Sequence, residues 1–286
     1  MSSSPFATQP PVGFGPGSQP GSEDGLAYMP LPSGMRTFEA HLPDVADKDR
    51  FAPALQVIAD VVAALQSWTE GSLATVSLAH LDAANRALVD ETLGEGEVAV
   101  KVTGQGPDGT DRAMEIQEAT FAGVWRLRGR EGADRIEVGA FPKGAILRAF
   151  PARWDVDLEA LAHPAPGVFN APPVLVEIAD RVARRAPGEA THVINLSLLP
   201  HTPEDLILFD EVLGRGATTI LSRGYGNCRI EAAALKNVWR VRFYNSTDML
   251  ILDTIEITDV PEVACAAAED IADSAERLVE VLAAMA

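Results

Sequence analysis

The segment from Ser222 to Arg229, with the sequence SRGYGNCR, holds the residue types best suited to recognition or reactivity. Its two glycines allow the backbone to turn tightly or to approach another molecule closely. Tyrosine and arginine often dominate binding energy at protein interfaces, and a cysteine beside arginines can have a lowered pKa. The segment therefore predicts a partner-binding site that consists of Arg223, Tyr225, Asn227, Cys228 and Arg229. The alternative is an ordinary glycine-rich turn with a small buried cysteine.

The rest of the sequence offers no recognisable catalytic or metal-binding pattern. The nucleophile, phosphate-loop and zinc-protease motifs are missing, and the five histidines are scattered without the spacing of metal ligands. Cys228 and Cys265, the two cysteines, form no CxxC pair, which argues against structural zinc. We therefore predict no metal, no cofactor and no catalytic residue.

Charge and hydropathy exclude several classes of partner. The chain of 286 residues has 41 acidic and 23 basic residues, a net charge of −18. Nucleic acids and anionic membrane surfaces both require a basic surface, so neither is expected to bind. No signal peptide and no apolar run of transmembrane length is found. Sparse cysteines are typical of a reducing compartment, and we expect a cytoplasmic protein.

The elements around this segment are predicted by an internal repeat. Residues 53–96 and 173–216 are identical at fifteen positions when they are aligned at a fixed offset of 120. Chance alone gives an identity at about one position in fifteen. The match resumes at an offset of 114, where VWRLR at 124–128 corresponds to VWRVR at 238–242. We interpret this pattern as a tandem duplication.

Each repeat predicts a helix, a short strand, a second helix and several further strands. The first helices are expected near 51–66 and 172–185, because their apolar residues recur at helical spacing. In the second repeat the next helix starts after Thr202 as N-cap and ends before Gly214, a typical C-cap. VWRVRF alternates as a half-buried strand does, Asn245–Asp248 predicts a hairpin turn, and a last helix is expected from about Pro261 to Ala284.

These elements predict an α+β fold of two similar lobes, each a mixed or mainly antiparallel sheet with flanking helices. Residues 1–36 are rich in proline, glycine and serine, and we expect a disordered tail there. The expected lobes are residues 37–150, the first repeat, and residues 165–286, the second.

The second repeat resembles the HupH/HyaF family of hydrogenase expression/formation proteins. The resemblance lies in LLPHTPEDLILFDEVLGRGATTILSRGYGNCRI and NVWRVRFYNSTDMLILDTIEITDVPEVACAA, and it covers roughly residues 190–275 closely. It implies an accessory protein, not an enzyme, for maturation of nickel–iron uptake hydrogenases. Its implied partners are hydrogenase structural subunit precursors, above all the iron–sulfur small subunit, and other hydrogenase accessory proteins. The family brings no established catalytic residues.

Two hypotheses about mechanism remain open at this point. An assembly chaperone or scaffold predicts a binding face without turnover. A thiol-dependent redox factor or enzyme predicts instead that Cys228 is reactive. Titration of the free thiols at neutral pH distinguishes them.

Overall fold

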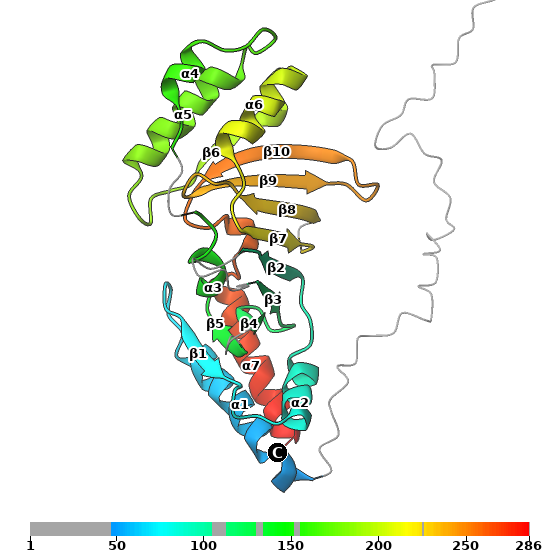
Figure 1. Ribbon diagram of the computed structural model, residues 1–286. Coiled ribbons are helices and arrows are strands. Elements are labelled where there is room, and N and C mark those ends of the chain that lie inside the picture. The colour runs from blue at the N-terminus through cyan, green and yellow to red at the C-terminus, as the bar shows by residue number, and fades with distance from the viewer. Residues whose placement is uncertain (1–46, 105–112, 130–133, 152–154, 225, 286) are drawn as a thin grey trace, which may run out of the picture. The chain divides into compact units, whose positions relative to one another are not determined.

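The structure is a computed structural model that describes residues 47–104, 113–129, 134–151, 155–224 and 226–285 (Figure 1). The predicted tail, residues 1–36, lies outside the described residues, and so does Tyr225 of the predicted binding segment.

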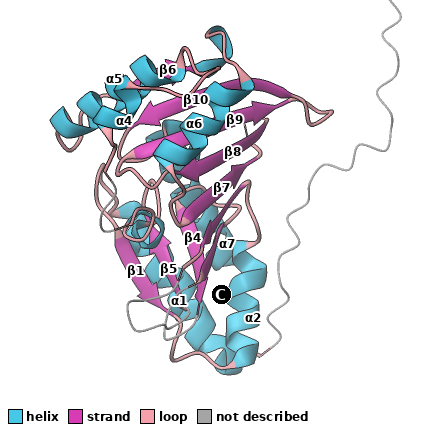
Figure 2. Cartoon of the chain, turned by 45° about the horizontal axis from the view of Figure 1, so that its top comes forward, coloured by secondary structure: helices cyan, strands magenta, loops and turns pink. Residues whose placement is uncertain are grey.

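The described strands form one antiparallel sheet of ten strands, in the spatial order β1-β5-β4-β3-β2-β7-β8-β9-β10-β6 (Figure 1). Figure 2 shows the strands in magenta. The α+β class is therefore confirmed. The strands are β1 (Ala74–Ser77), β2 (Val98–Val102), β3 (Met114–Glu118), β4 (Val124–Gly129), β5 (Arg135–Val138), β6 (His192–Asn195), β7 (Thr218–Ser222), β8 (Asn227–Ala232), β9 (Val238–Tyr244) and β10 (Leu250–Ile257).

Helices cover parts of this sheet. They are α1 (Lys48–Gln66), α2 (Ala83–Leu93), α3 (Lys143–Ile146), α4 (Leu158–Ala162), α5 (Ala171–Arg184), α6 (Pro203–Leu213) and α7 (Ala268–Met285), with short 3₁₀ turns η1 (Leu196–Leu198) and η2 (Glu262–Ala264). We call α1 to β5 the N-terminal half and α5 to β10 the C-terminal half. Both halves have the order helix, strand, helix and four strands. Among the described residues, no helix combines the length and apolar character needed to cross a membrane.

The two halves share their sheet, so the expectation of one sheet in each lobe is wrong. β2 pairs with β7 in a register that places Val100 opposite Ile220. The physical reason is that a free strand edge exposes unpaired backbone N–H and C=O groups. Pairing β2 with β7 satisfies both edges and joins the halves into one sheet.

Local signals place the helix ends as expected. The Thr202 hydroxyl accepts the Asp205 N–H at 3.0 Å, and the Asp205 carboxylate accepts the Thr202 N–H at 3.1 Å, which is a reciprocal capping box. Gly94 and Gly214 end α2 and α6 with φ of +62° and +59°. These positive values favour glycine at both C-caps.

The last helix starts later than predicted, at Ala268 instead of about Pro261. The intervening chain forms η2, and the Ala266 N–H then donates to the Ala140 carbonyl at 2.9 Å. This hydrogen bond fixes the connection on the N-terminal half before the helix begins.

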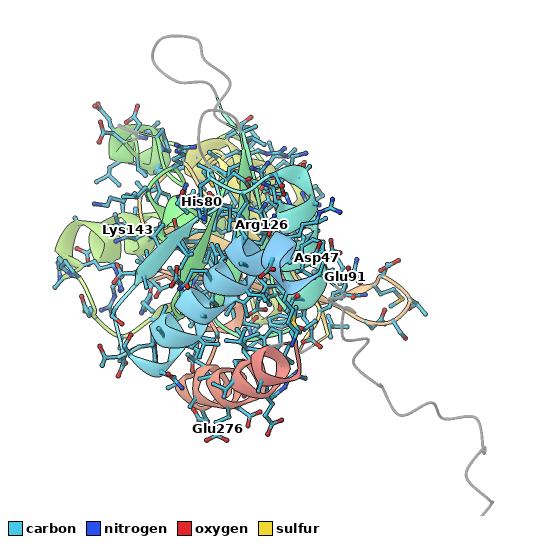
Figure 3. All side chains as sticks on the ribbon, turned by 90° about the horizontal axis from the view of Figure 1, so that it is seen from below. Asp47, His80, Glu91, Arg126, Lys143 and Glu276 are labelled. Atoms are coloured by element: carbon cyan, nitrogen blue, oxygen red, sulfur yellow. The ribbon has the colours of Figure 1, made fainter. Side chains whose placement is uncertain are left out.

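The helix layers exchange elements between the halves. α7 follows the C-terminal half in sequence, yet its Ile271 and Leu278 belong to the core formed by α1, α2 and strands β4 and β5. α4 follows the N-terminal half, yet its Leu161 belongs to the core of α5, α6 and β10. Figure 3 views this end of the molecule, where α1 and α7 lie side by side and Glu276 points outward from α7. The first predicted lobe is therefore packed with a helix of the second, and the second is packed with α4 from the connection between them.

The repeated tryptophans lie in the core. Trp125 and Trp239 are fully buried, and their indole N–H groups donate to the carbonyls of Gly139 at 2.8 Å and Thr258 at 3.2 Å. Both face the central apolar cluster on the side of the sheet that carries α3 and η2. The opposite side of the central strands carries polar residues.

Candidate protein-binding site

The predicted binding segment forms the β7–β8 hairpin. Ser222 ends β7, Asn227 begins β8, and residues 223–226 connect them. Arg223 and Asn227 are exposed, and the Arg223 N–H donates to the Glu97 carbonyl at 3.2 Å. Gly226 has a φ of +99°, which explains one of the two glycines. The segment therefore lies on a loop at a strand end, as expected, while its role in binding stays a prediction.

Strand alternation separates the residues that the sequence had grouped. Cys228 is only 3% exposed and lies in the central apolar cluster, whereas Arg229 points to the other, exposed face. Burial, and secondarily the charge of Glu256, raises the pKa of the Cys228 thiol to about 12. The expected lowering of this pKa is wrong, because residues adjacent in a strand face opposite sides.

The second thiol is no more acidic. Cys265 is partly buried and free, as Cys228 is free. Burial, with a contribution from Glu262, raises its pKa to about 12 as well. Because the thiolate is the reactive form, neither cysteine has the environment of a nucleophile or redox centre. Over the residues that the structure describes, no cluster of His, Cys, Asp or Glu side chains could hold a metal ion.

A neighbouring hairpin adds exposed apolar side chains that sequence reasoning missed. In the β9–β10 hairpin, Met249, Leu250 and Ile251 are 63%, 49% and 60% exposed. Tyr244 pairs with both Asn227 and Leu250, so the two hairpins end side by side. A signal was present, since three consecutive apolar residues directly after a polar turn cannot all face the core of a strand.

The polar turn of this hairpin is well ordered. The Asn245 side-chain oxygen accepts the N–H groups of Thr247 and Met249, both at 2.9 Å, and Asp248 has a φ of +57°. Asparagine commonly organises turns in this way. We call the exposed residues 223, 224, 226 and 227 of the first hairpin and 249–251 of the second the hairpin surface. It combines cationic, amide and apolar groups in a form suited to a protein partner.

Ion pairs continue from the hairpins along the polar side of the sheet. Arg240 bonds Asp253 through two contacts of 3.0 and 2.8 Å, and it also reaches Asp210 on α6 at 2.6 Å. The hydrogen bond to Asp253 raises the pKa of Arg240 above its usual value. Glu231 accepts from Arg229 at 2.7 Å and also pairs with Arg242.

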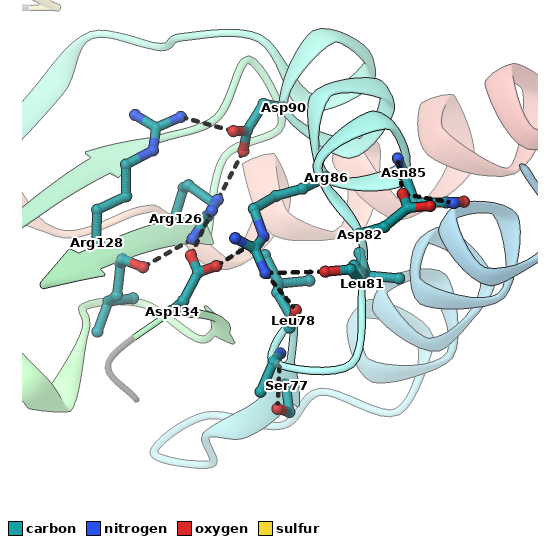
Figure 4. Close-up of polar contacts among 12 residues, drawn as sticks. Ser77, Leu78, Leu81, Asp82, Asn85, Arg86, Asp90, Arg126, Arg128 and Asp134 are labelled. Atoms are coloured by element: carbon teal, nitrogen blue, oxygen red, sulfur yellow. Dashed lines mark hydrogen bonds and ion pairs between the residues drawn. The ribbon is translucent and has the colours of Figure 1, made fainter. Parts of the chain in front are cut away.

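The N-terminal half has a corresponding network on the same side of the sheet (Figure 4). Arg126 bonds Asp90 on α2 at 2.7 Å and Asp134 at 2.5 Å, and Arg128 lies 3.2 Å from Asp90. Each network connects the second helix of a half to its sheet. The repeated arginines that the sequence showed in VWRLR and VWRVR are therefore structural ion-pair partners.

Comparison with known proteins supports the assignment of a family. The HupH hydrogenase expression protein C-terminal conserved region matches residues 168–285. The hydrogenase expression/formation protein HupH of Rhodobacter capsulatus is 55% identical over 276 residues, which cover 96% of this chain and 97% of that protein. HoxQ of Cupriavidus necator is 42% identical and covers 96% of both chains. The hydrogenase-1 operon protein HyaF of Escherichia coli is 34% identical and covers 94% of both.

A solved structure of the hydrogenase expression protein HupH from Thiobacillus denitrificans is 30% identical. It covers 40% of this chain and 96% of that chain, with a TM-score of 0.38. The sequence relatives extend over nearly the whole length, both halves included. The chain therefore belongs to the HupH family of hydrogenase expression/formation proteins.

Proposed function

We propose that this protein is an assembly factor for a nickel–iron uptake hydrogenase and binds the precursor of the iron–sulfur small subunit in the cytoplasm. The names of its relatives support a role in hydrogenase expression or formation. In this proposal it acts as a chaperone or scaffold and not as an enzyme. Other hydrogenase accessory proteins are further proposed partners.

The hairpin surface is the observation that carries this proposal. Met249, Leu250 and Ile251 expose apolar area beside Arg223 and Asn227, within the region that the family match covers. Exposed apolar side chains near polar ones mark protein interaction sites. A small surface of this kind suits a transient contact, because an assembly factor must release its client.

The predicted binding residues take different parts in this proposal. Arg223 and Asn227 contact the client directly, and Arg229 extends the contact along the sheet. Tyr225 is included from its sequence position alone. Cys228 supports the hairpin from the buried side, where its side chain meets the central cluster and no client.

We further propose that the two halves arose by tandem duplication and then diverged. Support comes from the shared order of elements and from the corresponding arginine–aspartate pairs, Arg126 with Asp90 and Arg240 with Asp210. The reciprocal positions of α4 and α7 fit two copies that exchanged their terminal helices.

The test is capture of the client from cells that produce the hydrogenase. Affinity-tagged protein is purified, and the small- and large-subunit precursors are each detected by immunoblot. We expect the small-subunit precursor to co-purify, and the Met249→Ser/Ile251→Ser variant to lose most of it. Leu147→Ser, which alters an apolar residue outside the hairpins that is 72% exposed, is the matched control and should retain capture.

Two results would contradict the proposal. Recovery of only the large-subunit precursor would show that the client is different. Unchanged capture by a folded Met249→Ser/Ile251→Ser variant would show that the client binds another surface.

A further inference from the structure

A second surface with a distinct charge lies beside β8 and β9. A hollow of about 290 Å³ is open between the end of α6 and the polar side of these strands. Its charged lining comprises four arginines and two carboxylates, namely Arg215, Arg229, Arg240, Arg242, Asp210 and Glu231. The whole chain has 41 acidic against 23 basic residues, so this hollow reverses the charge balance of the protein.

Part of this positive charge is not neutralised by the protein itself. Arg240 has two carboxylate partners, but Arg229 and Arg242 share the single carboxylate of Glu231. Arg215 makes no ion pair with any described residue. The Nε of Arg242 is buried and has no hydrogen-bond partner among the described residues. A buried donor without an acceptor is costly, so the protein itself leaves part of this arginine cluster unsatisfied.

The strand register adds to the positive charge. Arg229 and Arg242 are direct cross-strand partners on β8 and β9. Like charges at opposed positions destabilise a sheet. Glu231 relieves this repulsion only in part, because one carboxylate carries one charge and serves two guanidinium groups.

The N-terminal half shows that the fold does not require this arrangement. At the matched positions, Glu95 and Glu115 stand where Arg215 and Arg229 stand in the C-terminal half. Glu115 is the cross-strand partner of Arg128, so that pair joins opposite charges. The arginines of the C-terminal half replace a balanced pair with an unbalanced one, and their presence needs a reason other than the sheet.

We propose that this hollow binds the carboxylates of an acidic segment of a protein partner, through Arg215, Arg229 and Arg242. Guanidinium groups bind carboxylates by paired, charge-assisted hydrogen bonds. Arg229 belongs to the same β7–β8 hairpin as Arg223, so an acidic segment can reach this hollow from the hairpin surface. The inference rests on the proposed function for the identity of the partner as a protein, and its chemistry rests on the arginines.

The test uses a defined probe, a fluorescein-labelled hexaglutamate peptide, with the full-length protein. Fluorescence anisotropy is measured at low ionic strength, where the net negative charge of the protein repels an acidic peptide most strongly. Binding under this condition therefore requires a local positive site. We expect saturable binding that weakens about tenfold in Arg215→Gln and in Arg229→Gln, since each removes a charge-assisted contact. Binding should fall further in the double variant. Arg184→Gln is the matched control, because it removes an exposed arginine at the far end of α5.

Three outcomes would overturn the inference. Equal weakening by Arg184→Gln would indicate diffuse attraction, and a folded double variant with wild-type affinity would exclude the hollow. Tighter binding of inorganic phosphate than of the peptide would identify a small anion as the occupant. Arg215 lies in a loop, so its variant keeps the test valid if Arg229→Gln fails to fold. If the wild-type protein captures no precursor, the proposed function is refuted, and the peptide result is unaffected.

Discussion

Replacement of Asp205 by alanine should be among the most damaging single changes to this fold. Asp205 is fully buried, and one of its oxygens accepts the N–H groups of Phe169, Asn170 and Ala171 at 2.9, 3.0 and 2.9 Å. The other accepts the Thr202 N–H at 3.1 Å. One carboxylate therefore joins the N-termini of α5 and α6.

The cost follows from these four contacts. A hydrogen bond to a charged group contributes about 1.5–3 kcal/mol, and water can recapture some of the released N–H groups near the helix ends. We expect the free energy of unfolding to fall by about 3–5 kcal/mol, a large share of the stability of a typical domain. Asp205→Asn should cost less, because its oxygen can still accept three N–H groups while its amide opposes the Thr202 N–H.

The pH dependence has a defined sign. Burial alone would raise the pKa of Asp205, but the hydrogen bonds from the four backbone N–H groups outweigh it and hold the pKa well below its usual range. The contribution of a depressed carboxyl is present above the unfolded-state pKa of about 3.9 and is lost as the pH falls below it. The difference between wild type and Asp205→Ala should therefore be constant from pH 7 to pH 5.

The assay is urea unfolding at pH 7, followed by far-ultraviolet circular dichroism. Asp157→Ala is the matched control, because Asp157 is an exposed N-cap that accepts the N–H groups of Glu159 and Ala160 at 3.1 and 3.0 Å. It should cost about 1 kcal/mol. An Asp205→Ala variant that costs no more than Asp157→Ala would refute the argument from burial and contact number.

Two further predictions concern buried titratable groups. Burial, together with the charges of Glu97 and Asp270, raises the pKa of Glu118 to about 7 against hydrogen bonds from the Gly123 and Val98 N–H groups. A raised carboxyl pKa means that stability is lost as the pH rises from about 4 to 7. The Glu118→Gln variant should therefore be more stable than the wild type at pH 8 and nearly as stable as the wild type at pH 4.5. Equal unfolding free energies of the variant and the wild type at both pH values would contradict this prediction. The thiols of Cys228 and Cys265 should react slowly with a thiol-specific reagent at pH 7 in the folded protein and rapidly in urea, and fast reaction of either in the folded state would restore the redox hypothesis.

The local structure could be predicted from the sequence, because the signals involved act over a few residues. Thr202 and Gly214 bounded α6 through capping, and the alternation in VWRVRF identified a half-buried strand with Trp239 inside. Fifteen identities at one offset predicted that the halves share an order of elements. The α+β class followed from these elements, and the polar turn at Asn245–Asp248 was located correctly between β9 and β10.

How these elements combine could not be predicted in the same way, because it depends on contacts between residues that are distant in sequence. The joining of β2 to β7 uses backbone hydrogen bonds, which any residue except proline can make, so no residue pattern marks it. The exchange of α4 and α7 depends on which apolar surface is nearest, and a helix face suits either half. Cys228 and Arg229 are adjacent in sequence and face opposite sides of the strand. Cys228 is buried and Arg229 is exposed only because the central apolar cluster packs against one side of the sheet. The charge excess around Arg229 likewise arises from β8 and β9 lying side by side, because a charge balance depends on distances in space and not on separation along the chain.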